Sequence, residues 1–131
     1  MSDFKKLRVW QTAHALSLHV HRVTTRIRNP QFASLRSQAF RAAMSIPANI
    51  AEGRRQTTDA QFARYLGYAL NSASELEYHL IVARDIHLIS EAEFATLAAQ
   101  TISVRKMLYT LMKRLPTKSK RQSPIATPKT P

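Results

Sequence analysis

Apolar residues recur along this chain at intervals of three or four positions, the spacing of one face of an α-helix. The first series begins at Val9 and ends at Ile27, and it predicts a helix over residues 7–28. We expect this helix to stop at Asn29 and Pro30, because the residue before a proline avoids helical geometry. The members of the series are Val9, Ala13, Leu16, Val20, Val23 and Ile27.

A second helix is predicted over residues 31–54, with Gly53 close to its end. Its apolar series is Phe32, Leu35, Ala39, Ala42, Ile46 and Ile50. Pro47 lies inside this segment and removes one backbone hydrogen bond, so we expect a kink near residues 43–45. The alternative is that Pro47 breaks the segment into two helices.

Two capping boxes mark the starts of the remaining helices. Thr58 is followed three residues later by Gln61, and Ser90 is followed three residues later by Glu93. Residues 86–89 are predicted to form the turn between these helices. The apolar series of the third helix is Phe62, Leu66, Ala69, Ala73, Leu76, Leu80 and Ala83. That of the fourth is Phe94, Leu97, Thr101, Val104, Leu108, Leu111 and Leu115.

Four helices with short connections predict an all-α fold, an antiparallel up-down-up-down four-helix bundle. The alternating intervals of three and four residues favour left-handed, coiled-coil-like packing. Several apolar residues lie outside the four series, and they indicate either an oligomer interface or a wider core. They are Trp10, Phe40, Ala43, Tyr65, Tyr68, Ile102 and Tyr109.

The chain of 131 residues fits one domain and a short tail. The last segment, PTKSKRQSPIATPKTP, contains four prolines, four positive charges and a single isoleucine. Such a composition buries too little apolar surface to offset the entropy lost on ordering. We therefore expect a bundle over residues 1–115 and a disordered, basic, proline-rich tail over residues 116–131.

The net charge points to an anionic partner. The chain carries 20 Lys and Arg residues against 8 Asp and Glu residues, a formal charge of +12. By segment, the charge is +8 over residues 1–58, −4 over residues 59–93 and +8 over residues 94–131. An excess of this size is typical of proteins that bind nucleic acid, an anionic surface or an acidic protein.

The predicted topology gathers part of this charge at one end of the bundle, where the first helix starts, the second ends, the third starts and the fourth ends. The basic residues at this end, here named the basic pole, are Lys5, Lys6, Arg8, Arg54, Arg55, Lys113 and Arg114. Such a cluster can neutralise the phosphates of RNA or DNA without reading bases. Cations also complement the dipole at helix C-termini, so a merely solvated pole is the competing interpretation.

The composition offers little for catalysis. The absence of cysteine excludes disulfides and thiol chemistry, and two glycines are too few for a Gly-rich phosphate loop. No serine lies in a nucleophile-elbow motif. We therefore expect a protein that is not an enzyme and has no cofactor. Because the sequence contains neither a signal-peptide pattern nor an apolar run of membrane-spanning length, we expect a cytoplasmic protein that does not contact a membrane.

A metal site is a further possibility in a four-helix bundle. Such sites need Glu-x-x-His motifs on two helices, whereas this chain has one Glu-x-x-x-His pair, Glu75 and His79. We therefore expect no bound metal. The favoured interpretation is a partly buried polar network that fixes the register of the second and third helices. Its predicted members are Asn49, Glu52, Ser72 and Glu75.

Three segments carry a family resemblance: DFKKLRVWQTAHALSLHVH, LRSQAFRAAMSIPANIAEGRRQ and YLGYALNSASELEYHL. Together they resemble the four-helix bundle proteins of open reading frames in 23S ribosomal RNA intervening sequences, and SIPANIAEG is the most specific motif. The resemblance covers about residues 3–115. It implies a left-handed bundle that assembles into a cyclic homopentamer around a central channel. More distantly, the chain resembles the accessory protein of diversity-generating retroelements, a basic pentameric barrel that binds nucleic acid and a reverse transcriptase.

The sequence thus predicts a non-enzymatic, oligomeric four-helix bundle that binds the backbone of RNA or DNA through the basic pole. The alternative is an oligomeric scaffold that docks a protein partner and has no role with nucleic acid. Salt dependence separates the two, because phosphate binding weakens steeply as salt rises and a packed protein interface need not.

Overall fold

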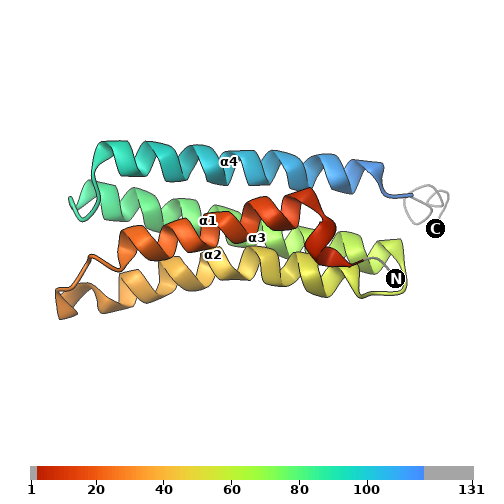
Figure 1. Cartoon of the computed structure of the whole chain (residues 1–131), viewed down its shortest axis with the longest axis horizontal. Helices are drawn as coiled ribbons and strands as arrows, with labels where there is room; N and C mark the ends of the chain where they lie inside the picture. Colours follow the sequence, from red (N-terminus) through yellow and green to blue (C-terminus); the bar gives the residue numbers. More distant parts are fainter. Residues whose placement is uncertain (1–2, 117–131) are drawn as a thin grey trace, which may run out of the picture.

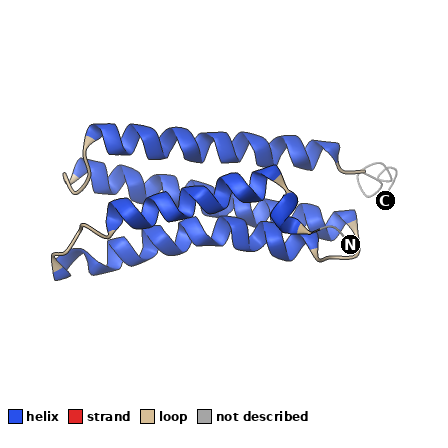
Figure 2. Cartoon of the chain, in the orientation of Figure 1, coloured by secondary structure: helices blue, strands red, loops and turns tan. Residues whose placement is uncertain are grey.

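A computed structural model describes residues 3–116 of the chain, and in this range it contains helices and no strands (Figure 2). Four α-helices account for most of the described residues. They are α1 (Arg8–Thr24), α2 (Ala33–Arg54), α3 (Asp59–Asp85) and α4 (Glu91–Arg114). Two short 3-10 turns, η1 (Phe4–Lys6) and η2 (Pro30–Phe32), precede α1 and α2. The tail expected over residues 116–131 lies outside the described residues except for Pro116.

Successive helices run in opposite directions and form an up-down-up-down four-helix bundle (Figure 1). Each helix packs against the next one in the chain, and α1 also packs against α4, which closes the bundle. The start of α1, the α2–α3 connection and the end of α4 therefore lie at the same end, on the right in Figure 1. The all-α, antiparallel four-helix bundle predicted from the apolar pattern is confirmed.

Most members of the apolar series form the buried core. Five pack against it and stay partly exposed: Phe32, Leu35, Phe94, Leu111 and Leu115. Leu16, Ile46, Leu76 and Leu108, one from each helix, are fully buried. Burying a side chain of this size stabilises the fold by about 1.5–3 kcal/mol relative to leaving it exposed. Of the residues outside the series, Ala43 is also buried. Trp10, Phe40 and Tyr65 are partly buried, and Tyr68, Ile102 and Tyr109 are exposed.

The first helix is shorter than its apolar series. We expected it to reach residue 28, but α1 ends at Thr24 and the chain turns there, with the Ile27 amide donating to the Thr24 carbonyl (2.9 Å). Ile27 still packs into the core from the connection. Its carbonyl accepts a hydrogen bond from the Arg36 guanidinium on α2, so contacts with a neighbouring helix hold this turn.

Pro47 does not break the second helix. Helix α2 continues from Ala33 to Arg54 with Pro47 buried inside it. The segment begins with the η2 turn, in which the Asn29 side chain accepts a hydrogen bond from the Gln31 amide (2.9 Å). Because proline has no amide hydrogen, α2 loses one backbone hydrogen bond at Pro47 but keeps most of the others. Packing against α1 and α3 also supports the helix.

The connections at the two ends of α3 follow local rules. Thr58 caps α3 by accepting from the Gln61 amide (3.1 Å). At its other end, His87 adopts the left-handed conformation (φ 64°), and the Leu88 amide donates to the Ala83 carbonyl (2.8 Å). This is the geometry of a Schellman motif, which reverses the chain within a few residues. None of the described helices combines the length and the apolar character needed to span a membrane.

Candidate nucleic-acid interface

The basic pole predicted from the sequence assembles at one end of the bundle. Lys5 and Lys6 belong to η1, Arg8 begins α1, and Arg54 and Arg55 end α2. Lys113 and Arg114 occupy the last turn of α4. The antiparallel topology therefore places these seven residues together, although they come from distant parts of the sequence (Figure 1). All except Arg54 are exposed, and Arg54 is partly exposed.

The cations of the basic pole form no ion pair within the described part of the chain. Three carboxylates lie at the same end, and none of them forms an ion pair with a cation of the basic pole. Asp3 accepts from the Lys5 backbone amide (2.9 Å), and Glu52 accepts from the Gln56 side chain (3.3 Å). Asp59 lies in the first turn of α3. Positive charge at this end is therefore available to an external anion.

The helix dipole explains only half of this arrangement. Arg54, Lys113 and Arg114 lie in the last turns of their helices, where the dipole favours cations. Lys6 and Arg8 flank the start of α1, where the dipole disfavours cations, and the first turn of α1 contains no acidic residue. The helix dipole therefore does not account for the positions of Lys6 and Arg8.

Arg54 is held in place by an aromatic ring. Its guanidinium lies over the ring of Phe62 from α3, with 5.5 Å between the guanidinium carbon and the ring centroid. Its Nε atom is buried and has no hydrogen-bond partner among the described residues. The ring fixes the side chain by a cation–π contact, and Arg54 remains partly exposed.

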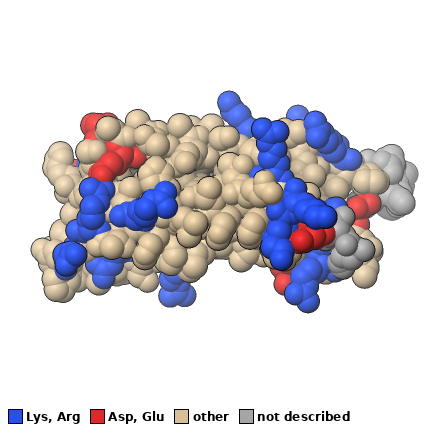
Figure 3. All heavy atoms as spheres, viewed as in Figure 1, with Lys and Arg blue, Asp and Glu red and all other residues tan. Residues whose placement is uncertain are grey.

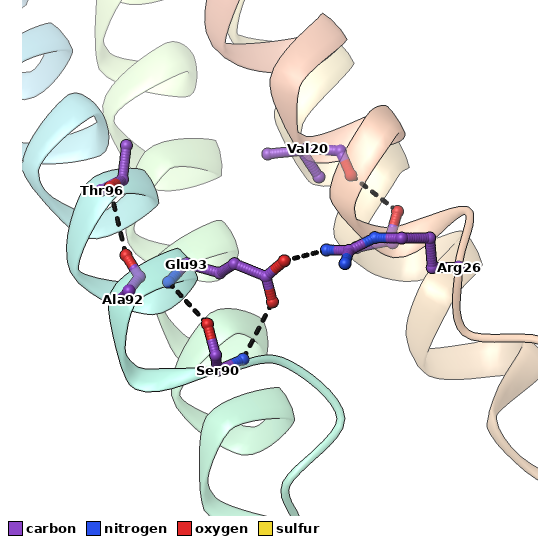
Figure 4. A network of polar contacts seen from close by, with 7 residues as sticks. Val20, Arg26, Ser90, Ala92, Glu93 and Thr96 are labelled. Atoms are coloured by element: carbon purple, nitrogen blue, oxygen red, sulfur yellow. Dashed lines mark hydrogen bonds and ion pairs between the residues drawn. The ribbon is translucent and has the colours of Figure 1, made fainter.

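The opposite end of the bundle differs because two of its cations form ion pairs. Arg26, in the turn after α1, forms an ion pair with Glu93 of α4, and Arg84 pairs with Asp85 (2.9 Å). Figure 4 shows Glu93 between Arg26 and the backbone amide of Ser90. The hydrogen bond from Ser90 and, after it, the Arg26 guanidinium hold the pKa of Glu93 below its usual value of 4.5. Figure 3 shows acidic side chains beside basic ones at this end, on the left.

A groove extends the basic pole along the seam between α1 and α4. It has a volume of about 660 Å³. Its lining is Leu7, Arg8, Val9, Thr12, Ser103, Lys106, Met107, Thr110, Leu111 and Arg114. Lys106 is exposed and was not part of the predicted pole. The spacing of Lys106, Thr110 and Arg114 at four-residue intervals is the sequence signal that could have included it, because residues four apart share a helix face.

The predicted polar network between α2 and α3 is correct in part. Ser72 of α3 hydrogen-bonds to Ser45 of α2 (2.8 Å), and the Asn49 amide donates to the Ser45 hydroxyl (3.0 Å). Glu52 and Glu75 do not join this network, because both are exposed and bind the residue four positions further along the chain, Gln56 and His79 respectively. The hydrogen bonds between α2 and α3 thus involve only uncharged side chains, and Ser45 takes part in place of the two predicted carboxylates.

The pair considered for metal binding lies on the surface of α3. His79 and Glu75 approach to 3.3 Å, and the Glu75 side chain is 57% exposed. Over residues 3–116, no three His, Asp or Glu side chains come together in a way that could hold a metal ion. The geometry of this pair is that of an ordinary i, i+4 contact on a helix surface.

Comparisons with known proteins agree with this architecture. A family model described as "23S rRNA-intervening sequence protein" matches residues 5–110. The chain is also similar to a crystal structure, at 1.70 Å resolution, of a protein with unknown function from the S23 ribosomal protein family of Bacteroides thetaiotaomicron VPI-5482. The two share 24% identity and superpose with a TM-score of 0.75, over 80% of this chain and 98% of that one. A search of curated proteins found no match.

Proposed function

Because the chain belongs to the family of 23S rRNA-intervening sequence proteins, as its motifs indicated, we propose that it acts without catalysis by binding the phosphate backbone of RNA or DNA at the basic pole. The observation that carries this proposal is the group of unpaired cations at one end of the bundle. Two of them, Lys6 and Arg8, flank the start of α1, where the helix dipole disfavours cations.

Binding at this pole is electrostatic and independent of base sequence. Lysine and arginine side chains neutralise phosphates and release counterions, which makes the affinity strongly dependent on salt. Phe62, the ring over which the Arg54 guanidinium lies, is buried and offers no face on which a base could stack. The pole therefore selects a polyanion and does not read its bases.

The proposal is tested by neutralising four cations of the pole together. In the variant Arg54→Gln, Arg55→Gln, Lys113→Gln and Arg114→Gln, binding of a generic single-stranded RNA is expected to fall at least tenfold, as measured by fluorescence anisotropy at low salt. The slope of log affinity against log salt should fall by about 3, since each neutralised phosphate of a single strand contributes about 0.7.

A matched control separates position from total charge. Arg22, Arg28 and Arg41 are also exposed, lie away from the pole, and form no ion pair within residues 3–116. Changing these three to glutamine removes nearly as much charge away from the pole and should reduce affinity much less. Equal losses in the two variants would show that binding depends only on overall charge, and full binding by the pole variant would refute the proposal.

The second candidate is an oligomeric scaffold for a protein partner. A hollow of about 400 Å³ between α1 and α2 supports it. This hollow, lined almost entirely by apolar side chains, includes Trp10, Leu18, Phe40 and Met44. Apolar surface of this kind is typical of contacts between proteins. A scaffold would bind its partner equally well at low and high salt, and this behaviour separates it from the phosphate-binding proposal.

A further inference from the structure

The groove between the first half of α1 and the last half of α4 combines features that the basic pole lacks. Three cations, Arg8, Lys106 and Arg114, stand along it, and no acidic residue contributes to its lining. Between them lie apolar side chains, among them Met107 and Leu111, which are only partly buried. The groove therefore suits an occupant that is negatively charged and also carries an apolar part.

Hydroxyl groups add hydrogen-bond acceptors to the groove. Thr12 donates its proton to the Arg8 carbonyl (3.0 Å), and Thr110 donates its proton to the Lys106 carbonyl (3.0 Å). Each hydroxyl oxygen keeps a free lone pair, because its proton is committed to the backbone. An occupant of the groove that brings N–H or O–H donors can therefore hydrogen-bond to these two oxygens.

We propose that this groove binds one or two nucleotides of a single-stranded nucleic acid, with phosphates on Arg8, Lys106 and Arg114 and a base against Met107 and Leu111. The proposal rests on the proposed function and extends it by naming the form of nucleic acid. A nucleotide joins the required parts in one unit: an anionic phosphate, a sugar with hydroxyl groups, and a flat base with N–H donors. The groove volume of about 660 Å³ lies within the range of about 300–1,000 Å³ that is common for small-molecule sites.

A duplex does not fit this groove in the same way. Its bases are stacked inside a rigid helix and expose only their edges, so no base face can lie on the apolar side chains, whereas the bases of a single strand can turn outward. An acidic peptide without aromatic residues, such as polyglutamate, matches the charge but lacks a flat group to lie on Met107 and Leu111. The contact with Met107 and Leu111 is aliphatic, so it accepts any base.

The charge of the groove is tested with Lys106→Glu, whose matched control is Arg64→Glu at an exposed position on α3. For a 12-nucleotide single strand, Lys106→Glu is expected to weaken binding at least tenfold, and Arg64→Glu less than threefold. For a 12-base-pair duplex the two variants should behave alike. If Lys106→Glu and Arg64→Glu reduce single-strand binding equally, the groove proposal is wrong, whereas the basic pole proposal stands.

The hydroxyl and apolar contacts have a second test. Thr110→Val preserves the shape of the side chain and removes the acceptor, so it should weaken single-strand binding several-fold. Thr96→Val is its control, because Thr96 makes the same bond to a backbone carbonyl at the other end of α4 (3.1 Å). A 12-unit strand of abasic sugar-phosphate should also bind several-fold more weakly than the normal strand to the wild-type protein.

These measurements distinguish failure of the groove from failure of the proposed function. If the wild-type protein binds no nucleic acid at low salt, both proposals are wrong. If the abasic strand binds as tightly as the normal strand, or if Thr110→Val matches Thr96→Val, the phosphates bind but the groove does not hold a base. Displacement of the strand by an equal concentration of polyglutamate would identify an acidic peptide as the better occupant and overturn the proposal.

Discussion

Glu93 illustrates how one side chain can serve two parts of the fold. It completes the capping box of α4 by accepting from the Ser90 amide (2.9 Å), and it also pairs with Arg26 from the turn after α1. Both contacts favour the charged carboxylate, which is why the pKa of Glu93 is lowered. The capping box was readable from the sequence because its partners are three residues apart, whereas Arg26 is distant along the chain.

This coupling predicts an acid sensitivity centred on Glu93. A lowered pKa contributes stability that is present above the usual value of 4.5 and is lost as the pH falls through the lower folded value. Glu93→Gln keeps a capping side chain but removes the titrating charge, so its unfolding free energy should decline less than that of the wild type below about pH 4.5. Urea unfolding at a series of pH values measures this. Glu91→Gln, which removes a charge from the same turn, should retain the wild-type decline, and an unchanged slope in Glu93→Gln would contradict the assignment.

At the scale of single elements, the close approach of α2 and α3 depends on Gly53. A Cβ atom at this position would lie 2.7 Å from the Cβ atom of Tyr65 and 2.9 Å from the ring of Phe62. Both distances are too short for two non-bonded carbon atoms. The Cβ atom of Tyr65 is attached directly to the backbone of α3, so it cannot move aside as the end of a flexible side chain could. A glycine in this turn is therefore required by packing between helices.

The two glycines of the chain allow a matched prediction. Gly53→Ala should destabilise the protein, because the strain of an overpacked contact, about 1–3 kcal/mol, exceeds the gain in helix propensity of about 1 kcal/mol. Gly67→Ala, in α3, meets no atom within 4 Å and should stabilise the protein by about 0.5–1 kcal/mol. Chemical denaturation of both variants checks this pair of signs. Stabilisation by Gly53→Ala would mean that α2 and α3 adjust freely.

Pro47, like Gly53, shows that packing between helices decides what a single residue does to the fold. The sequence left a kink and a break as alternatives, and the continuous α2 excludes the break. The propensity of one residue cannot settle this question, since the neighbours of a helix decide whether its remaining hydrogen bonds are kept. Pro47 also lines the apolar hollow between α1 and α2, so it contributes to the surface as well as to the helix.

At the scale of the whole molecule, the exposed apolar surface between α1 and α2 bears on self-association. Leu18 and Met44 on this surface are 44% and 41% exposed. The family resemblance implies a homopentamer, and burying this hollow between copies would remove apolar area from water. Association of copies would also bring several basic poles into one assembly and so strengthen binding to a long polyanion.

We therefore expect the protein to be oligomeric in solution, with a mass near five copies by light scattering after gel filtration. The variant Leu18→Glu and Met44→Glu should reduce this mass, because it places two charges in the apolar hollow. The variant Tyr78→Glu and Ile86→Glu changes two exposed apolar residues outside the hollow and is the control. A wild-type protein with the mass of one chain would contradict the expectation. Loss of assembly only in the control would place the interface elsewhere.

The sequence by itself determined the four helices, their caps at Thr58 and Ser90, and the apolar residues that form the core. These features depend on hydrogen bonds within one turn and on a spacing that repeats along one element, so the local sequence contains them. It also predicted the basic pole, because an antiparallel order follows from short connections. The family follows from motifs in the chain, and the match over residues 5–110 confirms it.

Only the tertiary structure decided which side chains of different helices meet. It ended α1 at Thr24 instead of residue 28, put Ser45 where Glu52 and Glu75 were expected in the interhelical network, and brought Lys106 beside the basic pole. Each outcome depends on how far a helix is rotated about its axis and shifted along its neighbour. A rotation of one residue, about 100°, moves a side chain from the interior to the solvent, and the spacing along a single helix does not specify that angle relative to the next helix.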